Sequence, residues 1–192
     1  TTFLNALTGF IPADERLITI EDSAELQIRG IPNLVRMETR NANVEGCQPI
    51  TIRDLIKTSL RMRPDRIIVG EVRGGEAVDL IASALNCGHD GSMSTGHANS
   101  AQDMLMRLET MMLMGMEIPL PAIRRQIASG VDIIVHLGRL RDKTRKVLQI
   151  AEVTGIEDGE IRLSSLFSFE EEGETSGRVQ GRLVRKEKLL HE

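Results

Sequence analysis

The chain has 192 residues, of which 41% are hydrophobic, which is enough for one α/β domain with a full core but too little for two sizeable domains. A net charge of −4 and the absence of Trp and Tyr argue against a surface that wraps a polyanion or stacks the bases of a single-stranded nucleic acid. The two cysteines favour a reducing compartment, no apolar run approaches the roughly 18 residues of a membrane span, and no signal peptide opens the chain, so the sequence predicts a cytosolic protein.

The chain opens with helical character at Thr1-Thr2-Phe3-Leu4, without a cap or a preceding strand. Because a natural domain seldom begins inside a helix, we expect the chain to be cut. The motif G-x-x-x-x-G-K-[ST] runs straight into a helix, so one interpretation is a phosphate loop whose glycines and lysine lie upstream and whose Mg²⁺-binding hydroxyl is Thr1. The alternative is an ordinary helix start, which two threonines before an amphipathic helix usually mark.

Carboxylates follow two predicted buried strands. The first strand is expected at 16–20 and ends on Glu21 and Asp22, and the second is expected at 67–69 and ends on Glu71. Open α/β sheets bind ligands at the carboxyl ends of their strands, so these positions suit a general base. A solvated turn explains either position alone, but the repetition after two strands favours a functional role.

Two further short strands are predicted at 26–28 and 34–39. The second carries Arg36 and, at its end, Arg40 on one face, because strand side chains alternate with a period of two. These arginines are interpreted either as ordinary surface charge or as groups that reach a phosphate, for which the guanidinium fork suits bidentate contact.

A capped helix is expected from residue 51 to Arg63, where Pro64 ends it by disfavouring helical backbone in the residue before. Arg63 stands shortly before the strand that leads to Glu71. It is either solvent-facing or part of a shell that stabilises charge at the site.

A strand–helix–strand unit follows, with the helix expected at 77–85 and the second strand at 91–95. This unit delivers Glu71 and His97 to the same edge of the sheet. His97 is open to two interpretations, a packed core histidine or a group that hydrogen-bonds or senses a phosphate. The nearby Cys and His residues match no recurrent zinc spacing, so no metal site is expected from them.

Beyond residue 100 the sequence predicts a capped, methionine-rich helix, a second helix opened by Pro119 and Pro121, and a β-hairpin about Asp158-Gly159. The methionines are interpreted as adaptable core packing, with a partner-binding surface as the alternative. Residues 167–192 are strongly charged, first acidic and then basic. They are expected to form an appended tail or a fragment of a further element.

Four stretches resemble one family in order and spacing: T-T-F-L-N-A-L, I-T-I-E-D-S-A-E-L, L-R-M-R-P-D-R-I-I-V-G-E-V-R-G-G-E-A and T-G-H-A-N-S. They are similar to the secretion ATPase superfamily of type II and type IV systems, and most similar to its tight-adherence pilus branch, CpaF. The resemblance implies an α/β, RecA-like P-loop NTPase core over 1–166, with a mostly parallel sheet flanked by helices and a C-terminal β-hairpin. This core would lack its first strand and most of the phosphate loop, and 167–192 would be a charged tail.

The resemblance also implies ATP and Mg²⁺ as cofactors and assigns roles to residues of this chain. Thr1 would be the hydroxyl on Mg²⁺, and Thr2 its neighbour on the phosphates. Glu21 would be the general base that orients the attacking water. Glu71 would be the Walker B glutamate and His97 the residue that senses the γ-phosphate.

Arginines complete the site that the resemblance implies. Arg63, and after it Arg36 and Arg40, are the candidates for charge compensation in a phosphoryl transfer. The residue before the Walker B glutamate is Gly70, where most P-loop ATPases have an aspartate that helps to hold Mg²⁺. The glutamates and Thr1 would therefore share the outer shell of the ion.

By resemblance, the protein is a hexameric motor subunit with ATP bound between subunits. It would drive pilus assembly or protein secretion at the cytoplasmic face of the bacterial inner membrane, with membrane platform proteins as partners and no direct contact with nucleic acid. The alternatives are a RecA-like nucleic-acid-dependent ATPase, which the acidic charge disfavours, and a non-catalytic assembly subunit. Without the amides and lysine of a phosphate loop, we expect the 192-residue chain alone neither to bind ATP well nor to hydrolyse it.

Overall fold

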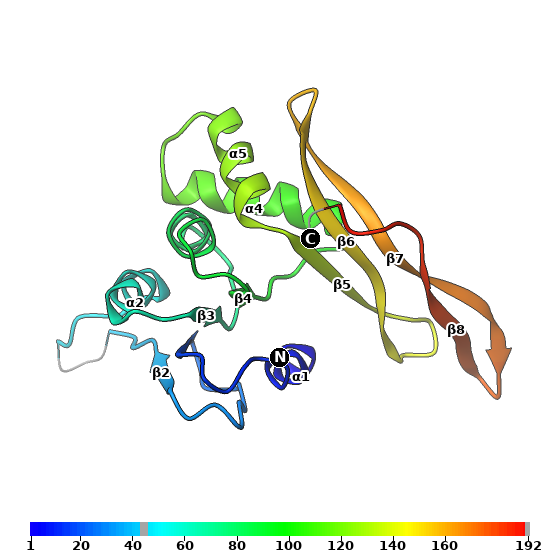
Figure 1. Cartoon of the computed structure of the whole chain (residues 1–192), viewed down its shortest axis with the longest axis horizontal. Helices are drawn as coiled ribbons and strands as arrows, with labels where there is room; N and C mark the ends of the chain where they lie inside the picture. The colour runs from blue at the N-terminus through cyan, green and yellow to red at the C-terminus, as the bar shows by residue number, and fades with distance from the viewer. Residues whose placement is uncertain (43–45, 191–192) are drawn as a thin grey trace. The chain divides into compact units, whose positions relative to one another are not determined.

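The computed structural model describes residues 1–42 and 46–190 and divides into two compact units. One unit holds a parallel sheet and the other an antiparallel sheet, and the strands of both can be followed in Figure 1. The expected α/β architecture with a parallel sheet is therefore observed. The first unit comprises Thr1–His97 and Met111–Glu117, and the second comprises Ala98–Thr110 and the chain from Ile118 onward.

The parallel sheet has four strands in the order β2-β1-β3-β4. Every residue of β1 is buried, and so is every residue of β3 after the first, as the two-sided covering of a parallel sheet requires. Each strand lies where the sequence predicts one. The strands are β1 (Leu17–Glu21), β2 (Leu34–Glu38), β3 (Arg66–Val69) and β4 (Met93–Ser94).

Two helices help to cover this sheet. The first, α1 (Thr2–Thr8), contributes Leu4 to a buried cluster that includes Ile68 of β3. The second, α2 (Ile52–Ser59), packs against β1 and buries Ile56 completely. Because both strand and helix residues are fully withdrawn from water, the carboxyl edge of the sheet is held in a fixed frame.

The expected strand at 26–28 is wrong, because side chains satisfy its backbone groups instead of a neighbouring strand. The N–H of Leu26 donates to the carboxylate of Glu21 at 2.8 Å. The carbonyl oxygens of Leu26 and Ile28 accept from the guanidinium of Arg36 at 2.8 and 3.3 Å. A segment whose backbone polar groups are paired in this way needs no ladder partner.

The capped start of α2 is confirmed. The hydroxyl of Thr51 accepts from the N–H of Asp54 at 3.2 Å, and the Asp54 carboxylate accepts from the N–H of Thr51 at 2.9 Å. The hydrogen bond from the Thr51 side chain holds the pKa of Asp54 below its usual value. After Ser59 the helix tightens into a 3₁₀ turn at Leu60–Met62. This turn ends at Arg63, whose φ of 52° is left-handed.

The helix expected at 77–85 begins as α3 (Ala77–Asp79) and continues as a π-helical segment, Leu80–Leu85. At the junction, Asp79 is buried and its carboxylate lies 2.5 Å from the guanidinium of Arg53 on α2. A buried charge of this kind is tolerated because it is paired. The pair therefore fastens α2 to the segment that follows β3.

Gly75 and Gly115 bring the loop after β3 into direct backbone contact with the end of α4 (Ala101–Gly115). A Cβ atom added at Gly115 would lie 2.2 Å from the carbonyl oxygen of Gly75, and one added at Gly75 would lie 2.9 Å from the Cα of Gly115. No side chain fits at either position without moving backbone.

The second unit contains a four-stranded antiparallel sheet in the order β5-β6-β7-β8, together with α5 (Leu120–Gly130). The hairpin expected at Asp158-Gly159 is confirmed between β6 and β7, and both turn residues have positive φ, as a tight hairpin turn requires. The strands are β5 (Ile133–Arg139), β6 (Arg145–Glu157), β7 (Glu160–Thr175) and β8 (Arg178–Arg185).

The charged stretch after residue 166 does not stand apart from this sheet. Residues 167–175 continue β7, and β8 pairs with them in an antiparallel register from Phe167↔Arg185 to Thr175↔Arg178. Of the two interpretations left open by the sequence, the described residues match a fragment of a further element. Within the described part of the chain, no helix is long and apolar enough to cross a membrane.

Candidate active site

Glu21 ends β1 as a buried carboxylate, with only 4% of its surface exposed. One of its oxygens, Oε1, accepts from two consecutive backbone amides, those of Glu25 at 2.9 Å and Leu26 at 2.8 Å. The neighbouring strand leaves room for it, because a Cβ atom at Gly70 would lie 3.1 Å from the Glu21 Cγ. The sequence thus places a carboxylate at a strand end and the loop then fixes its direction.

Glu71 follows β3 and meets His97, as the sequence predicts. Its Oε1 lies 3.1 Å from the His97 Nε2, and the glutamate side chain is 19% exposed whereas the histidine is 82% exposed. The backbone around it is held by Thr95, whose hydroxyl donates to the Gly70 carbonyl at 2.6 Å and whose carbonyl accepts from the Val72 N–H at 2.9 Å. The carboxylate is therefore presented from a backbone held by hydrogen bonds toward an exposed histidine.

Arg73 connects the acidic ends of the two strands. Its Nη2 donates to the Oε2 of Glu71 at 2.6 Å, and its Nη1 lies 3.9 Å from the Oδ2 of Asp22. The hydrogen bond to Glu71 raises the pKa of Arg73 further above its usual value. Asp22 is also held by the hydroxyl of Thr39, which donates to its Oδ1 at 3.2 Å.

Thr1 is linked to Glu21 through one intermediate residue. Its hydroxyl donates to the Oε2 of Glu25 at 2.9 Å, and the backbone of Glu25 donates to Glu21. Thr2 is the first residue of α1, for which Thr1 is the N-cap. Thr1 and Glu21, to which the sequence assigns a metal-binding and a water-orienting role, are thus joined by hydrogen bonds through Glu25.

The Thr1 hydroxyl and the carboxylates of Glu21 and Glu71 fit a Mg²⁺ ion that is held jointly with a substrate. Hydroxyl and carboxylate oxygens are the donors that this ion prefers, but it usually keeps water and phosphate ligands and takes few from the protein. Within residues 1–42 and 46–190, no three His, Cys, Asp or Glu side chains are placed to form a complete metal site. The chain offers partial ligation of the type found at phosphoryl-transfer sites.

The three arginines that the sequence predicts for charge compensation do not join this group. Arg36 donates to the carbonyl oxygens of Leu26 and Ile28 and so supports the loop after β1. Arg40 donates to the carbonyl oxygen of Gln48 at 3.2 Å. Arg63 precedes β3 and therefore lies at the opposite end of that strand from Glu71. Their roles in charge compensation stay predictions.

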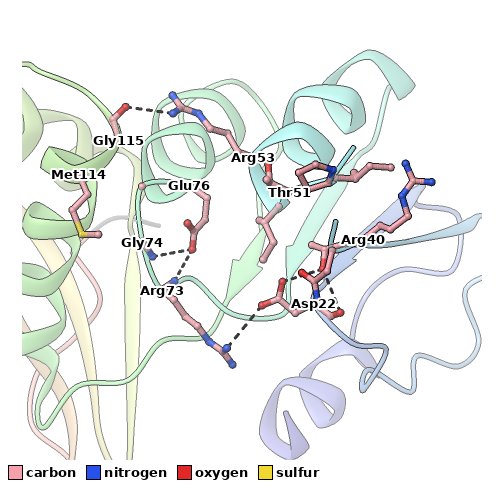
Figure 2. A pocket seen from close by; sticks show the side chains of 15 residues that line it. Asp22, Arg40, Thr51, Arg53, Arg73, Gly74, Glu76, Met114 and Gly115 are labelled. Carbon is pink, nitrogen blue, oxygen red and sulfur yellow. Dashed lines mark hydrogen bonds and ion pairs between the residues drawn. The ribbon is translucent and has the colours of Figure 1, made fainter. Parts of the chain in front are cut away.

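A pocket of about 540 Å³ lies next to the acidic strand ends, within the first unit (Figure 2). Asp22 and Arg73 belong to its wall as well as to the carboxylate group described above. Arg40, Thr51 at the start of α2, and Gly115 also line it. The pocket and the carboxylates thus share one guanidinium, that of Arg73.

Sequence reasoning assigned no role to Arg73, Glu25 or Thr95. A signal for Arg73 exists, since it stands two residues after Glu71 and side chains two apart share a face in extended chain. Glu25 and Thr95 act through a backbone amide and backbone carbonyls that pattern alone does not reveal.

Comparison with known proteins gives a family model described as "Type II/IV secretion system protein", which matches residues 1–186. A putative conjugal transfer protein of Mycobacterium tuberculosis is 45% identical over 151 residues, which are 79% of this chain and 42% of that protein. The type IV secretion system protein VirB11 of Brucella suis is 42% identical over 71% of this chain and 39% of its own length. The chain thus spans about two fifths of the length of these curated relatives.

Solved structures of ATPases also align with this chain. The VirB11 ATPase of the Brucella suis type IV secretion system, crystallised in complex with sulphate, aligns with a TM-score of 0.70 and 36% identity over 79% of this chain and 45% of that chain. The Yersinia pseudotuberculosis ATPase DotB aligns with a TM-score of 0.56 over 79% of this chain and 39% of that chain, but at 17% identity this likeness concerns the fold alone.

Proposed function

Because the chain belongs to the type II/IV secretion system protein family, we propose that it forms the catalytic part of an ATP-hydrolysing motor subunit for secretion or pilus assembly. The observation that supports this most directly is the meeting of Glu71 with His97 at 3.1 Å, beside the buried Glu21, at the carboxyl ends of parallel strands. This edge is where open α/β sheets bind their ligands.

In this proposal, each group at the edge has a separate task. Glu21, fixed by two amides, orients the attacking water and accepts its proton. Glu71 and Thr1 hold Mg²⁺, which when bound neutralises charge on phosphate oxygens. His97 contacts the terminal phosphate, and Thr2 lies next to the preceding phosphates. The exposure of His97 leaves it accessible to such a ligand.

In this proposal the phosphate cradle is supplied by residues other than these 192. The 192 residues contain no Gly-Lys pair, so they hold no G-x-x-x-x-G-K-[ST] loop. We expect the chain by itself neither to bind ATP well nor to hydrolyse it. Arg63 lies away from the catalytic glutamate in its own chain, so its proposed role requires that it act on the site of a neighbouring subunit, as a ring with ATP between subunits allows.

The finer assignment is to the tight-adherence pilus branch, in a hexamer docked on inner-membrane platform proteins. It rests on the resemblance of the four sequence motifs. The test is made in the source bacterium, by deleting the gene and imaging surface pili. Loss of pili, restored by the wild type but not by Glu71→Gln, supports this branch; unchanged pili with lost protein export would assign the motor to another secretion system.

The enzymatic proposal is tested on the complete protein by measuring phosphate release from ATP with and without Mg²⁺. We expect Mg²⁺-dependent turnover that falls by about a hundredfold or more in Glu21→Gln, the scale of a positioned acid/base group. A second arm adds single- or double-stranded DNA. Strong stimulation by DNA would favour the nucleic-acid motor, and unchanged turnover in Glu21→Gln would contradict the assigned base.

A further inference from the structure

Arg73 has its backbone held from both sides, so its side chain starts from a fixed point. On one side the preceding residue, Val72, is buried and its N–H donates to the Thr95 carbonyl at 2.9 Å. On the other side the Glu76 carboxylate accepts from the N–H groups of Arg73 at 2.7 Å and Gly74 at 2.9 Å. Figure 2 shows Arg73 leaving this anchored turn and reaching toward Asp22.

The guanidinium and the histidine hold different oxygens of one carboxylate. Arg73 donates to the Oε2 of Glu71 at 2.6 Å, and the His97 Nε2 lies 3.1 Å from the Oε1. With a contact on each oxygen, both the position and the plane of the carboxylate are set. A second Arg73 nitrogen, Nη1, lies 3.9 Å from the Asp22 Oδ2, so the same fork reaches toward the carboxylates that follow β1 and β3.

This ion pair contributes little to folding. The Arg73 side chain is 66% exposed and opens on the pocket, and an ion pair that water screens in this way adds little to stability. The glutamate it contacts is, by contrast, 19% exposed and stands at the proposed reaction centre. The pair is therefore better explained by its effect on the orientation of the Glu71 carboxylate than by a contribution to the stability of the fold.

We infer that Arg73 is a positioning residue for the reaction: it orients the Glu71 carboxylate toward the bound metal and nucleotide without touching either. This inference rests on the proposed function. A lysine at this position would supply the charge but not the planar fork that reaches Glu71 and Asp22 together. The role is thus one of geometry as well as charge.

The test uses the complete protein and three variants, Arg73→Ala, Arg73→Lys and the control Arg107→Ala, an exposed arginine of α4 outside the site. We expect Arg73→Ala to lower kcat by about ten- to a hundredfold, the scale of a lost hydrogen bond between charged groups, with KM for ATP changed by less than about threefold. Arg73→Lys should recover part of the loss. Free guanidinium ion at tens of millimolar, far below denaturing concentrations, should restore turnover in Arg73→Ala only.

Each outcome decides the inference. A fall in kcat that guanidinium rescues, with an unchanged thermal midpoint, supports it. A rise in KM with kcat preserved would instead make Arg73 a nucleotide contact, and a loss without rescue would make it structural; both overturn the inference while the proposed function stands. An inactive wild-type protein overturns the two together, and so is told apart from failure of the inference alone.

Discussion

The two sheets of this protein handle charge in opposite ways. At the carboxyl edge of the parallel sheet, Glu21, Asp22 and Glu71 gather on neighbouring strand ends, with the single guanidinium of Arg73 contacting two of them. In the antiparallel sheet, the acidic run of β7 is met by cations across the surface. These pairs are Glu170 with Lys186, Glu171 and Glu174 with Arg141, and Glu172 with Arg182.

The contrast separates the proposed functional cluster from a solvated face. Gathering like charges costs folding free energy, whereas spreading them as exposed pairs costs little and contributes little. The parallel sheet can carry the cluster because its strands are fully buried and its loops donate to the carboxylates. Sites that collect like charges on a rigid frame are the ones expected to do chemistry.

The largest expected effect comes from neutralising one carboxylate in each sheet. Glu71→Gln in the complete protein should lower ATP turnover by about a hundredfold or more, because the charge that faces the metal and His97 is lost. The matched change Glu171→Gln removes a carboxylate paired with Arg141 on β7 and should leave turnover unchanged. Steady-state phosphate release measures both, and equal effects in the two variants would remove the distinction between the sheets.

The next effect concerns packing. Ile68→Ala in β3 removes a side chain with no exposed surface and should lower the free energy of unfolding by about 2–5 kcal/mol. Leu183→Ala in β8 removes one that is 38% exposed and should cost less than about 1 kcal/mol. Denaturant unfolding followed by circular dichroism gives both values. Similar losses in the free energy of unfolding would mean that side chains of the antiparallel sheet contribute as much to stability as those buried in the parallel sheet.

A smaller effect is expected from adding a methyl group at a glycine. Gly115→Ala drives a Cβ atom into the backbone of Gly75 and should cost about 1–3 kcal/mol, because backbone has to move. Gly138→Ala in β5 meets the Cδ1 of Leu148, the end of a flexible side chain that can rotate away, and should cost less than half as much. Thermal midpoints compare the two, and a costlier Gly138→Ala would contradict the reasoning.

The smallest effect is a titration on the antiparallel sheet. The hydrogen bond from Arg141 holds the pKa of Glu171 below its usual value of 4.5. A depressed folded-state pKa means that this pair stabilises the fold above the pKa of the unfolded chain and that the contribution is lost as pH falls through the folded-state pKa. In Arg141→Gln the pKa of Glu171, followed by NMR, should rise, whereas Lys143→Gln in the same turn should leave it in place.

The sequence predicts most of the parallel sheet because its strands are short apolar runs that need no distant information. It fails at 26–28, where Glu21 and Arg36 take the backbone groups that a strand would have used. At β7 the sequence leaves a tail and a further element both open, because the cationic partners of its acidic residues, such as Arg182 on β8 and Arg141 in the turn after β5, are distant in sequence.

The site was predictable as far as it depends on strand ends. Glu71 and His97 follow neighbouring strands, and the structure brings them together. Arg63 and Arg36 stand on or near the strands that lead to the glutamates. However, Arg63 precedes β3 and so lies at the end of that strand opposite Glu71, and Arg36 donates to backbone carbonyls instead. Proximity along the chain therefore misleads wherever a side chain has a backbone acceptor within reach.

The amide pair on the Oε1 of Glu21 limits how far that carboxylate can move. The Glu21 carboxylate accepts hydrogen bonds from two amides of the loop that follows it. It cannot swing away without breaking them, so we expect it to stay in place. His97, by contrast, is 82% exposed, and its side chain contacts that of Glu71. Of these two side chains, Glu21 and His97, that of His97 is the one whose displacement would leave the loop after β1 intact.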